Sequence, residues 1–181
     1  PAQEYITRAL SSEKDVITAN KEVMAKHGAE LLEHAETHGR ELLFEASVGG
    51  GIPIIRPLQE DFLANQISSI RAIINGTTNF ILTEMASGGM DYQAALKHAQ
   101  KLGYAERDPS DDVTGIDAAY KLSILASLAF HTRIHFDDVY YEGIENLEAH
   151  DFLYADELGF SIKLLAIAKK ESDGIQIRVH P

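Results

Sequence analysis

Residues 115–131, GIDAAYKLSILASLAFH, form a long apolar run that predicts a largely buried helix. Asp117 and Lys121 stand four residues apart, so one side of this helix carries both. At about 100° per residue, Ile124 and Leu128 lie beside that pair, and small or apolar residues cover the opposite side. The predicted helix therefore has no clearly solvated side, and its Asp and Lys must be paired in a buried or cleft setting.

The Asp117–Lys121 pair has two interpretations. It is either an internal ion pair that supports the fold or part of a functional site. Burial lets a lysine lose its proton more easily, whereas a neighbouring carboxylate opposes that loss, so the two together can hold a proton donor of usable strength. We favour the functional interpretation, with the structural ion pair as its alternative.

The segments on either side of this helix predict an α+β fold, in which helices pack on one face of a mixed, largely antiparallel sheet. Apolar periodicity predicts further helices over 21–39, 78–87, 91–102 and 149–158. Strands are predicted over 41–47, 67–74 and 139–143. Residues 162–169 and 175–179 predict a hairpin that turns at Asp173 and Gly174.

The composition excludes several classes of function. The chain of 181 residues has 28 Asp and Glu against 16 Lys and Arg, a formal charge of -12, and such an acidic chain without a basic run repels nucleic-acid phosphates. The absence of cysteine excludes disulfides, thiolate zinc sites and cysteine nucleophiles. No apolar stretch approaches the roughly 20 residues that a membrane helix needs. We therefore expect no nucleic-acid partner, no membrane association and a cytoplasmic location.

An acidic stretch, GYAERDPSDDVT at residues 103–114, leads into the Asp117–Lys121 helix and carries Glu106, Asp108, Asp111 and Asp112. One interpretation is a solvated loop in which Asp111 or Asp112 lies near a helix N-terminus, where the helix dipole favours negative charge. The other is a pocket for a cationic substrate group such as an amine, with Glu106 as the best candidate because it follows a Gly-Tyr turn. A divalent-metal site is a further alternative, although the spacing differs from that of a calcium loop.

Three consecutive glycines, Gly49 to Gly51, follow the strand predicted over 41–47. They do not form a dinucleotide fingerprint, because Ile54 occupies a position that the fingerprint requires to be glycine, and no Walker lysine follows. Glycines after a strand let the backbone approach closely, and exposed carbonyls next to Glu45 could ligate a hard cation through oxygen. Plain turn geometry is the alternative.

Four segments follow one another in an order typical of one known family. They are TANK at residues 18–21, EASVGGGIPII at 45–55, INGTTNFIL at 74–82 and GYAERDPSDDVTGIDAAYKLSIL at 103–125. Together they span most of the chain and resemble homoserine dehydrogenase. The resemblance implies an oxidoreductase that interconverts L-homoserine and L-aspartate 4-semialdehyde with NAD(P), a step toward threonine and methionine.

The resemblance implies roles for residues of the helix and of the acidic stretch. Lys121 matches the family's proton donor or acceptor, and Asp117 matches a catalytic and substrate-binding carboxylate. Glu106 matches the residue that binds the amino group of homoserine. Asp111 and Asp112 match an acidic pair of the same motif, to which we assign substrate binding jointly.

The resemblance also implies a cofactor cleft and a cation site. Lys21 and Gly103 match positions that line the cofactor and reaction cleft. The family's monovalent-cation site, usually holding sodium, matches Glu45 together with three backbone carbonyls, those of Val48, Gly50 and Ile52. The resemblance therefore favours cation binding over plain turn geometry.

By the same resemblance, residues 1–20 correspond to the end of a nucleotide-binding domain, and residues 21–181 to a catalytic and dimerisation domain. The family's glycine-rich nucleotide-binding half is missing from this sequence, so we expect the chain to be inactive alone. We expect a homodimer, because an apolar sheet can pair across a two-fold axis. Two alternatives stay open: a non-catalytic dimerisation module, and a related NAD(P)-dependent dehydrogenase of another amino or hydroxy acid.

Overall fold

The structure is a computed structural model that describes residues 1–181. These residues form two compact units, each built from segments that are distant in sequence. The first unit comprises Pro1–Ser68, Tyr120–Asp138 and Lys170–Asp173. The second comprises Ser69–Ala119, Val139–Lys169 and Gly174–Pro181.

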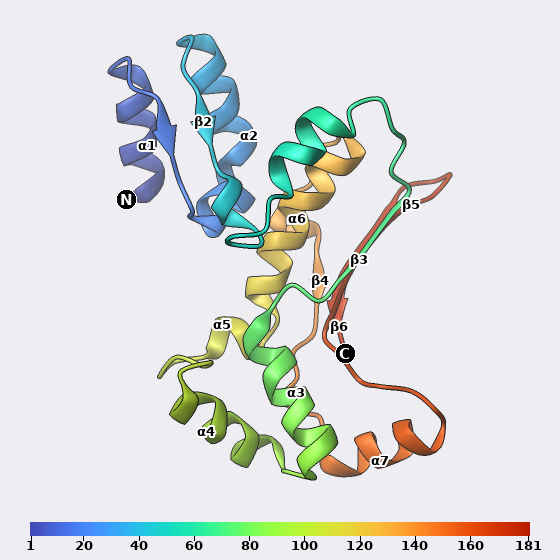
Figure 1. The fold of residues 1–181 in the computed structure, drawn as a ribbon. Coiled ribbons are helices and arrows are strands. Elements are labelled where there is room, and N and C mark those ends of the chain that lie inside the picture. Colours follow the sequence, from blue (N-terminus) through green and yellow to red (C-terminus); the bar gives the residue numbers. More distant parts are fainter. The chain divides into compact units, whose positions relative to one another are not determined.

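The first unit begins with a helix followed by a βαβ motif (Figure 1). The elements are α1 (Ala2–Ser11), β1 (Val16–Ile17), α2 (Lys21–Thr37) and β2 (Leu42–Leu43). The strands pair in parallel, with Val16 opposite Leu42 and Ile17 opposite Leu43. Parallel neighbours need a crossover connection, which α2 supplies. The loops that follow β1 and β2 therefore leave from the same edge of the pair.

Helix α2 confirms the helix predicted over 21–39. It begins where the Asn20 side chain accepts a hydrogen bond from the Val23 N–H at 3.0 Å. It buries an apolar stripe that includes Leu31 and Ala35. It ends before Gly39, whose φ of 62° favours glycine.

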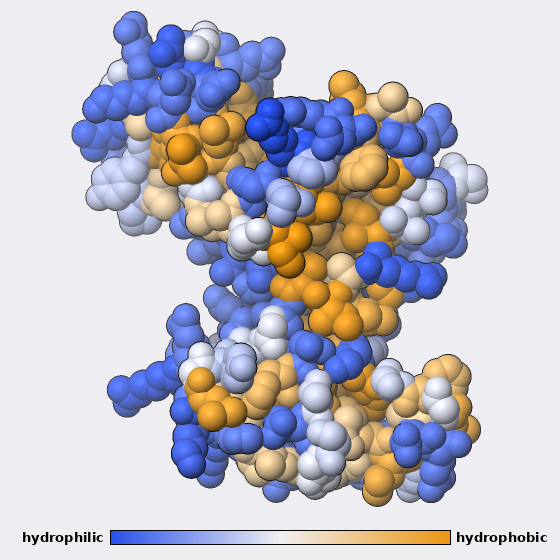
Figure 2. Space-filling view, in the orientation of Figure 1, coloured by the Kyte–Doolittle hydropathy of each residue, from blue (hydrophilic) through white to orange (hydrophobic).

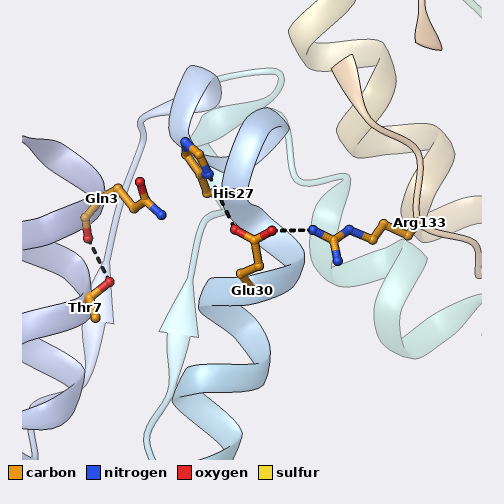
Figure 3. A network of polar contacts seen from close by, with 5 residues as sticks. All are labelled: Gln3, Thr7, His27, Glu30 and Arg133. Carbon is orange, nitrogen blue, oxygen red and sulfur yellow. Dashed lines mark hydrogen bonds and ion pairs between the residues drawn. The ribbon is translucent and has the colours of Figure 1, made fainter. Parts of the chain in front are cut away.

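Polar contacts connect α2 to a later part of the first unit (Figure 3). Arg133 donates to one carboxylate oxygen of Glu30, and the Nδ1 atom of His27 lies 3.5 Å from the other oxygen. Both Arg133 and Glu30 are exposed, and exposed ion pairs contribute at most about 1 kcal/mol. The buried stripe of α2, more than this network, therefore holds the helix in place.

The segment after β2 differs from the strand predicted over 41–47, because the strand ends at Leu43. A 3₁₀ turn, η1 (Glu45–Ser47), follows, in which the Ser47 N–H donates to the Phe44 carbonyl at 2.9 Å. The chain then passes the three glycines and enters a π-helical turn, η2 (Pro57–Asp61). The early end of the strand places Glu45 in this turn and not in the strand.

A four-stranded mixed sheet lies mostly in the second unit (Figure 1). In spatial order its strands are β3 (Ser69–Ala72), β5 (Leu165–Lys170), β6 (Ile175–His180) and β4 (Tyr140–Tyr141). β3 and β5 are antiparallel, whereas β4 and β6 are parallel. β5 and β6 are neighbours joined by residues 171–174, a connection so short that only a hairpin allows it. The α+β class and the hairpin are confirmed, and the β1–β2 pair is an additional sheet that the sequence patterns did not predict.

Helix α3 (Gly76–Gly88) lies at the centre of the helices of the second unit and packs against the other three. These are α4 (Tyr92–Leu102), α5 (Ser110–Val113) and α7 (Ala149–Glu157). Ile81 and Leu82 of α3 are 0% exposed, as are Ala95 and Ala99 of α4. The small residues of α4 let the two helices approach closely, so that the start of α3 is held by a packed core.

The apolar helix predicted over 115–131 is α6 (Ile116–Phe130), whose first turn belongs to the second unit and whose remainder belongs to the first. Every residue from 117 to 126 except Lys121 is buried. Gly115 precedes the helix with a φ of 87°, and a Cβ there would lie 3.2 Å from the Glu142 carbonyl oxygen, so the entry to α6 requires glycine. Neither α6 nor any other helix combines the length and apolar character needed to cross a bilayer.

Gly143 lies where a side chain has no room. A Cβ there would overlap the Val113 carbonyl oxygen and the backbone of Thr114, which cannot move aside as a flexible side chain could. The Ile144 N–H donates to the same Val113 carbonyl at 2.8 Å, which holds the two segments together. We expect Gly143→Ala to lower the free energy of unfolding by about 3 kcal/mol, toward the upper end of overpacking costs. Denaturant unfolding measures this loss, and an equal loss for the control Gly174→Ala, where no atom lies within 4 Å, would contradict it.

Candidate functional site

Two of the carboxylates singled out in the sequence meet at the side chain of Asn75. The Asn75 Nδ2 atom donates to Asp112 Oδ1 at 2.7 Å and to Asp117 Oδ2 at 2.9 Å. Asn75 is 5% exposed and Asp117 is 4% exposed, and all three residues belong to the second unit. Carboxylates that are buried, like Asp117, or half-buried, like Asp112, require hydrogen-bond partners, and one amide supplies a donor to each.

Asn75 is also the N-cap of α3. Its Oδ1 atom accepts from the Thr78 N–H and from the Thr78 hydroxyl, both at 2.8 Å. A backbone N–H can only donate, so the amide oxygen must face the helix and the NH₂ group must face the two carboxylates. The orientation of the Asn75 side chain therefore follows from its hydrogen bonds.

Lys121 follows Asp117 by one turn of α6, so both side chains start on the same side of the helix. Lys121 is half-buried, whereas its neighbours Tyr120 and Leu122 are 7% and 0% exposed. It is thus the point where this buried stretch of α6 reaches accessible surface. A lysine that exchanges a proton with a bound molecule needs such a position.

Glu106 lies in the exposed loop between α4 and α5. The Thr77 hydroxyl, in the first turn of α3, donates to the Tyr104 carbonyl at 2.8 Å, and the Gln100 side chain donates to the Glu106 carbonyl at 3.1 Å. The Thr77 bond attaches the loop to the start of α3, next to Asn75, and the Gln100 bond attaches it to α4. The structure thus joins Asp112 and Asp117 through Asn75, whereas Glu106 and Asp111 are exposed.

Gly103 ends α4 and starts the loop that carries Glu106. Its φ is 80°, in the left-handed region that favours glycine, and its N–H donates to the Gln100 carbonyl at 3.1 Å. The Tyr104 N–H then donates to the Ala99 carbonyl at 2.9 Å. The direction of the Glu106 loop therefore depends on this glycine.

Lys21 and the glycine turn leave the β1–β2 pair at the same edge. Lys21 begins α2 just after β1 and is half-buried, and the three glycines follow β2. The Ser47 hydroxyl donates to the Thr18 carbonyl at 3.5 Å, which links the two loops. Ligands of open α/β sheets bind at this carboxyl edge. The cofactor residue Lys21 and the cation turn, both predicted from the resemblance, thus lie on one edge of the first unit.

The Glu45 carboxylate binds the start of the next helical segment. Oε1 accepts from the N–H groups of Ile54 and Ile55 at 2.6 and 2.8 Å, and Oε2 accepts from the Arg56 N–H at 2.8 Å. Burial raises the pKa of the Glu45 carboxyl, but the three N–H donors outweigh burial and hold the pKa below its usual value. This capping role draws the chain out of the β2 direction and explains why the strand is shorter than predicted.

A cation at this turn would be held by backbone oxygens. No group of three or more His, Cys, Asp or Glu side chains is placed to hold a metal ion, and the Glu45 carboxylate is engaged with backbone donors. Gly49 and Gly50 have φ of 78° and 58°, and the Gly49 carbonyl accepts from the Ile52 N–H at 3.1 Å. The predicted ligands are the carbonyls of the residues around it, and carbonyl oxygens suit a hard cation.

We expect Glu45→Ala to lower the free energy of unfolding by about 2 kcal/mol at neutral pH, because three N–H groups lose their acceptor. The folded-state pKa is lowered, so this contribution is complete above the pKa of the unfolded carboxyl and is lost as pH falls through the folded value. Unfolding curves of both proteins, from neutral pH down to about pH 3, measure the difference. A difference that does not shrink toward acid, or an equal loss in the exposed control Glu41→Ala, would contradict the capping role.

Sequence patterns did not indicate Asn75 or Thr77 as site residues. One signal was present, since an Asn directly before a helix is a typical N-cap, and the predicted helix over 78–87 starts only two residues late. The partners of Asn75 lie 37 and 42 residues away, and no local pattern predicts contacts at such separations.

Two protein-family models match this chain. The model described as homoserine dehydrogenase matches residues 53–181, and the model described as homoserine dehydrogenase, NAD binding domain, matches residues 1–45. The first match includes Asn75, Asp117 and Lys121, and the second includes the βαβ motif. The division predicted after residue 20 stays a prediction.

Named relatives agree with these matches. The homoserine dehydrogenase of Synechocystis sp. is 52% identical over 185 residues, covering 100% of this chain and 43% of the relative. That of Corynebacterium glutamicum is 50% identical, covering 99% of this chain and 41% of the relative. The chain thus spans less than half the length of these relatives.

Solved structures resemble the fold closely. A homoserine dehydrogenase from Thiobacillus denitrificans superposes with a TM-score of 0.97 at 50% identity, covering 100% of this chain and 42% of that one. A hyperthermophilic archaeal homoserine dehydrogenase in complex with NADPH superposes with a TM-score of 0.83 at 34% identity, covering 99% of this chain and 51% of that one.

Proposed function

Because this chain belongs to the homoserine dehydrogenase family, we propose that it carries the catalytic residues of an enzyme that interconverts L-homoserine and L-aspartate 4-semialdehyde with NAD(P). The observation that carries the proposal is the Asn75-linked pair of Asp112 and Asp117, one helical turn before Lys121. Since the chain spans less than half the length of its relatives, the full-length enzyme of this proposal is a homoserine dehydrogenase of family length that contains this chain.

The carboxylates bind the ammonium end of the substrate in this proposal. Glu106 and Asp117 hold the ammonium group, and Asp111 and Asp112 add negative charge beside them. A cation in a partly desolvated cleft requires such compensating charge. Holding the amino end at the start of α6 leaves the other end of a four-carbon substrate to reach Lys121, one turn along the helix.

Lys121 transfers the proton of the reaction. The bound nicotinamide cofactor supplies the hydride that the carbonyl carbon of the semialdehyde accepts. As the new C–H bond forms, the carbonyl oxygen takes up negative charge, and the Lys121 ammonium gives it the proton that completes the hydroxyl of homoserine. In the oxidative direction the same nitrogen removes that proton.

The βαβ motif supports the proposal of NAD(P) binding. It lies within the residues matched by the NAD binding domain model, and Lys21 lies at its carboxyl edge. We assign Lys21 and Gly103 to the lining of the cofactor cleft. Hydrophobic side chains are exposed over β1 and β2, including Ile17 at 83% and Leu43 at 51% (Figure 2). Parallel sheets are normally covered on both faces, so we propose that further segments of the nucleotide-binding domain cover this one in the full-length enzyme.

Three further assignments accompany this proposal. We assign a sodium ion to the turn of Glu45, Val48, Gly50 and Ile52, whose backbone oxygens suit a hard cation. We propose a homodimer, which sedimentation of the full-length enzyme would test. We also propose that the enzyme acts in the cytoplasm, in the synthesis of threonine and methionine.

Consumption of NADH or NADPH by the purified full-length enzyme with L-aspartate 4-semialdehyde tests the proposed reaction. Turnover that requires the semialdehyde supports it. A stable dimer without turnover on either nicotinamide would refute it in favour of the dimerisation module. Turnover only with the aldehyde of another amino or hydroxy acid would instead favour the related dehydrogenase.

A further inference from the structure

We propose that Asn75 is a positioning residue, which orients the catalytic carboxylate Asp117 and so the ammonium end of the substrate. This inference rests on the function proposed above. It starts from the observation that one buried amide connects three things: the first turn of α3, Asp112 and Asp117. Capping α3 alone would require only the contacts to Thr78.

Two carboxylates of like charge share one nitrogen as their hydrogen-bond donor. The bonds from Asn75 Nδ2 measure 2.7 and 2.9 Å, so the two carboxylate oxygens lie at most 5.6 Å apart, the sum of these lengths. Carboxylates so close repel each other, and hydrogen-bond donors that lie between them offset part of that repulsion. The NH₂ group of Asn75 provides one hydrogen to each, which brings Asp112 and Asp117 together around a single position.

The α3 cap makes this arrangement rigid. Because Thr78 donates twice to Oδ1, the Asn75 side chain cannot turn its amide without breaking both bonds. Ile81 and Leu82, one turn further along α3, are fully buried and anchor the helix. The direction of the Asp117 carboxylate is thus coupled to the core of the second unit, which is the preorganisation that a catalytic group needs.

Substitutions can separate the two roles of Asn75, which are to cap α3 and to donate to the two carboxylates. In Asn75→Asp the side chain would still cap α3, because Asp and Asn are equally good N-caps. The same side chain would, however, present an acceptor in place of a donor to the two carboxylates. Ala at the same position would remove both the cap and the donor. A control exists in Asp91, which caps α4 by accepting from the Ala94 N–H at 2.8 Å and is exposed.

The test measures kcat and both KM values in the full-length enzyme, with rates expressed per folded enzyme from thermal unfolding curves. We expect Asn75→Asp and Asn75→Ala to lower kcat by about 10²-fold, a typical effect of misplacing a reacting group. The KM for the cofactor should stay within about twofold. Asp91→Ala should leave kcat unchanged.

A double-mutant cycle identifies the group through which Asn75 acts. If Asn75 acts through Asp117, then Asn75→Ala should lower kcat by less than about threefold in an Asp117→Asn background. A further loss of about 10²-fold there would overturn the inference. So would wild-type kcat in Asn75→Asp, since the cap alone would then suffice. An unmodified full-length enzyme without turnover would refute the proposed function and the inference together, whereas an active enzyme insensitive to Asn75→Asp would refute the inference alone.

Discussion

Lys121→Ala is expected to lower the turnover number of the full-length enzyme by about 10³-fold, within the range of 10² to 10⁴ that a general acid or base contributes. Lys121 is the one residue from 117 to 126 of α6 that is not buried, and it follows Asp117 by a single turn. No second lysine occurs in α6 that could replace it. Steady-state rates at saturating substrate should fall in both directions, because the donor in one direction is the acceptor in the other.

Further variants separate proton transfer from charge and from stability. Lys121→Arg keeps the positive charge, but a guanidinium does not release its proton at neutral pH, so turnover should fall as it does in Lys121→Ala. Lys121→Met keeps the length of the side chain without its charge. If that variant kept wild-type turnover and lost roughly 3 kcal/mol of stability, as broken buried ion pairs do, the structural interpretation of the pair would hold instead. Lys97→Ala, at an exposed lysine of α4, controls for the loss of one charge.

Elements determined by local pattern were predicted closely. The apolar run at 115–131 is α6 (Ile116–Phe130). A continuously apolar run of this length is too long for a typical strand, so the pattern predicts a buried helix. The helix predicted over 91–102 is α4 (Tyr92–Leu102), because Asp91 caps its start and Gly103 ends it in the left-handed region. Both ends of α4 thus depend on residues that are adjacent in sequence.

Features determined by distant contacts were missed. β1 contains only two residues, too few for periodicity to reveal, and its parallel pairing with β2, which lies within the strand predicted over 41–47, depends on the α2 crossover. The strand predicted over 41–47 is shortened by the Glu45 carboxylate, which binds N–H groups 9 to 11 residues ahead. Apolar character indicated a strand there, but a side-chain hydrogen bond decided the structure.

Removal of the substrate's amino group is expected to lower kcat/KM by more than any of the single substitutions lowers turnover. The compound 4-hydroxybutyrate is homoserine without that group, and its kcat/KM should be lower than that of L-homoserine by roughly 10⁴-fold. Sites built to bind a polar group reject analogues without it by 10⁴ to 10⁵, because the polar groups of the site are then left unpaired. Here Asp117 is 4% exposed and Asp112 lies beside it, so loss of the ammonium group would remove a favourable charge interaction from two neighbouring carboxylates. Oxidation rates of the two alcohols by the full-length enzyme measure this ratio.

The same ratio shows which carboxylates bind the ammonium group. Glu106→Gln removes one negative charge from an exposed loop, so it should lower kcat/KM for L-homoserine while leaving the slow oxidation of 4-hydroxybutyrate nearly unchanged. Asp108→Asn, in the same loop, is the control, because the Asp108 carboxylate already accepts hydrogen bonds from Ser110. A ratio below about 10 in the unmodified enzyme, or equal losses on both alcohols in Glu106→Gln, would show that the acidic loop does not recognise the amino group. In that case the proton-transfer role of Lys121 could stand, but the specificity for an amino acid would have to come from other residues.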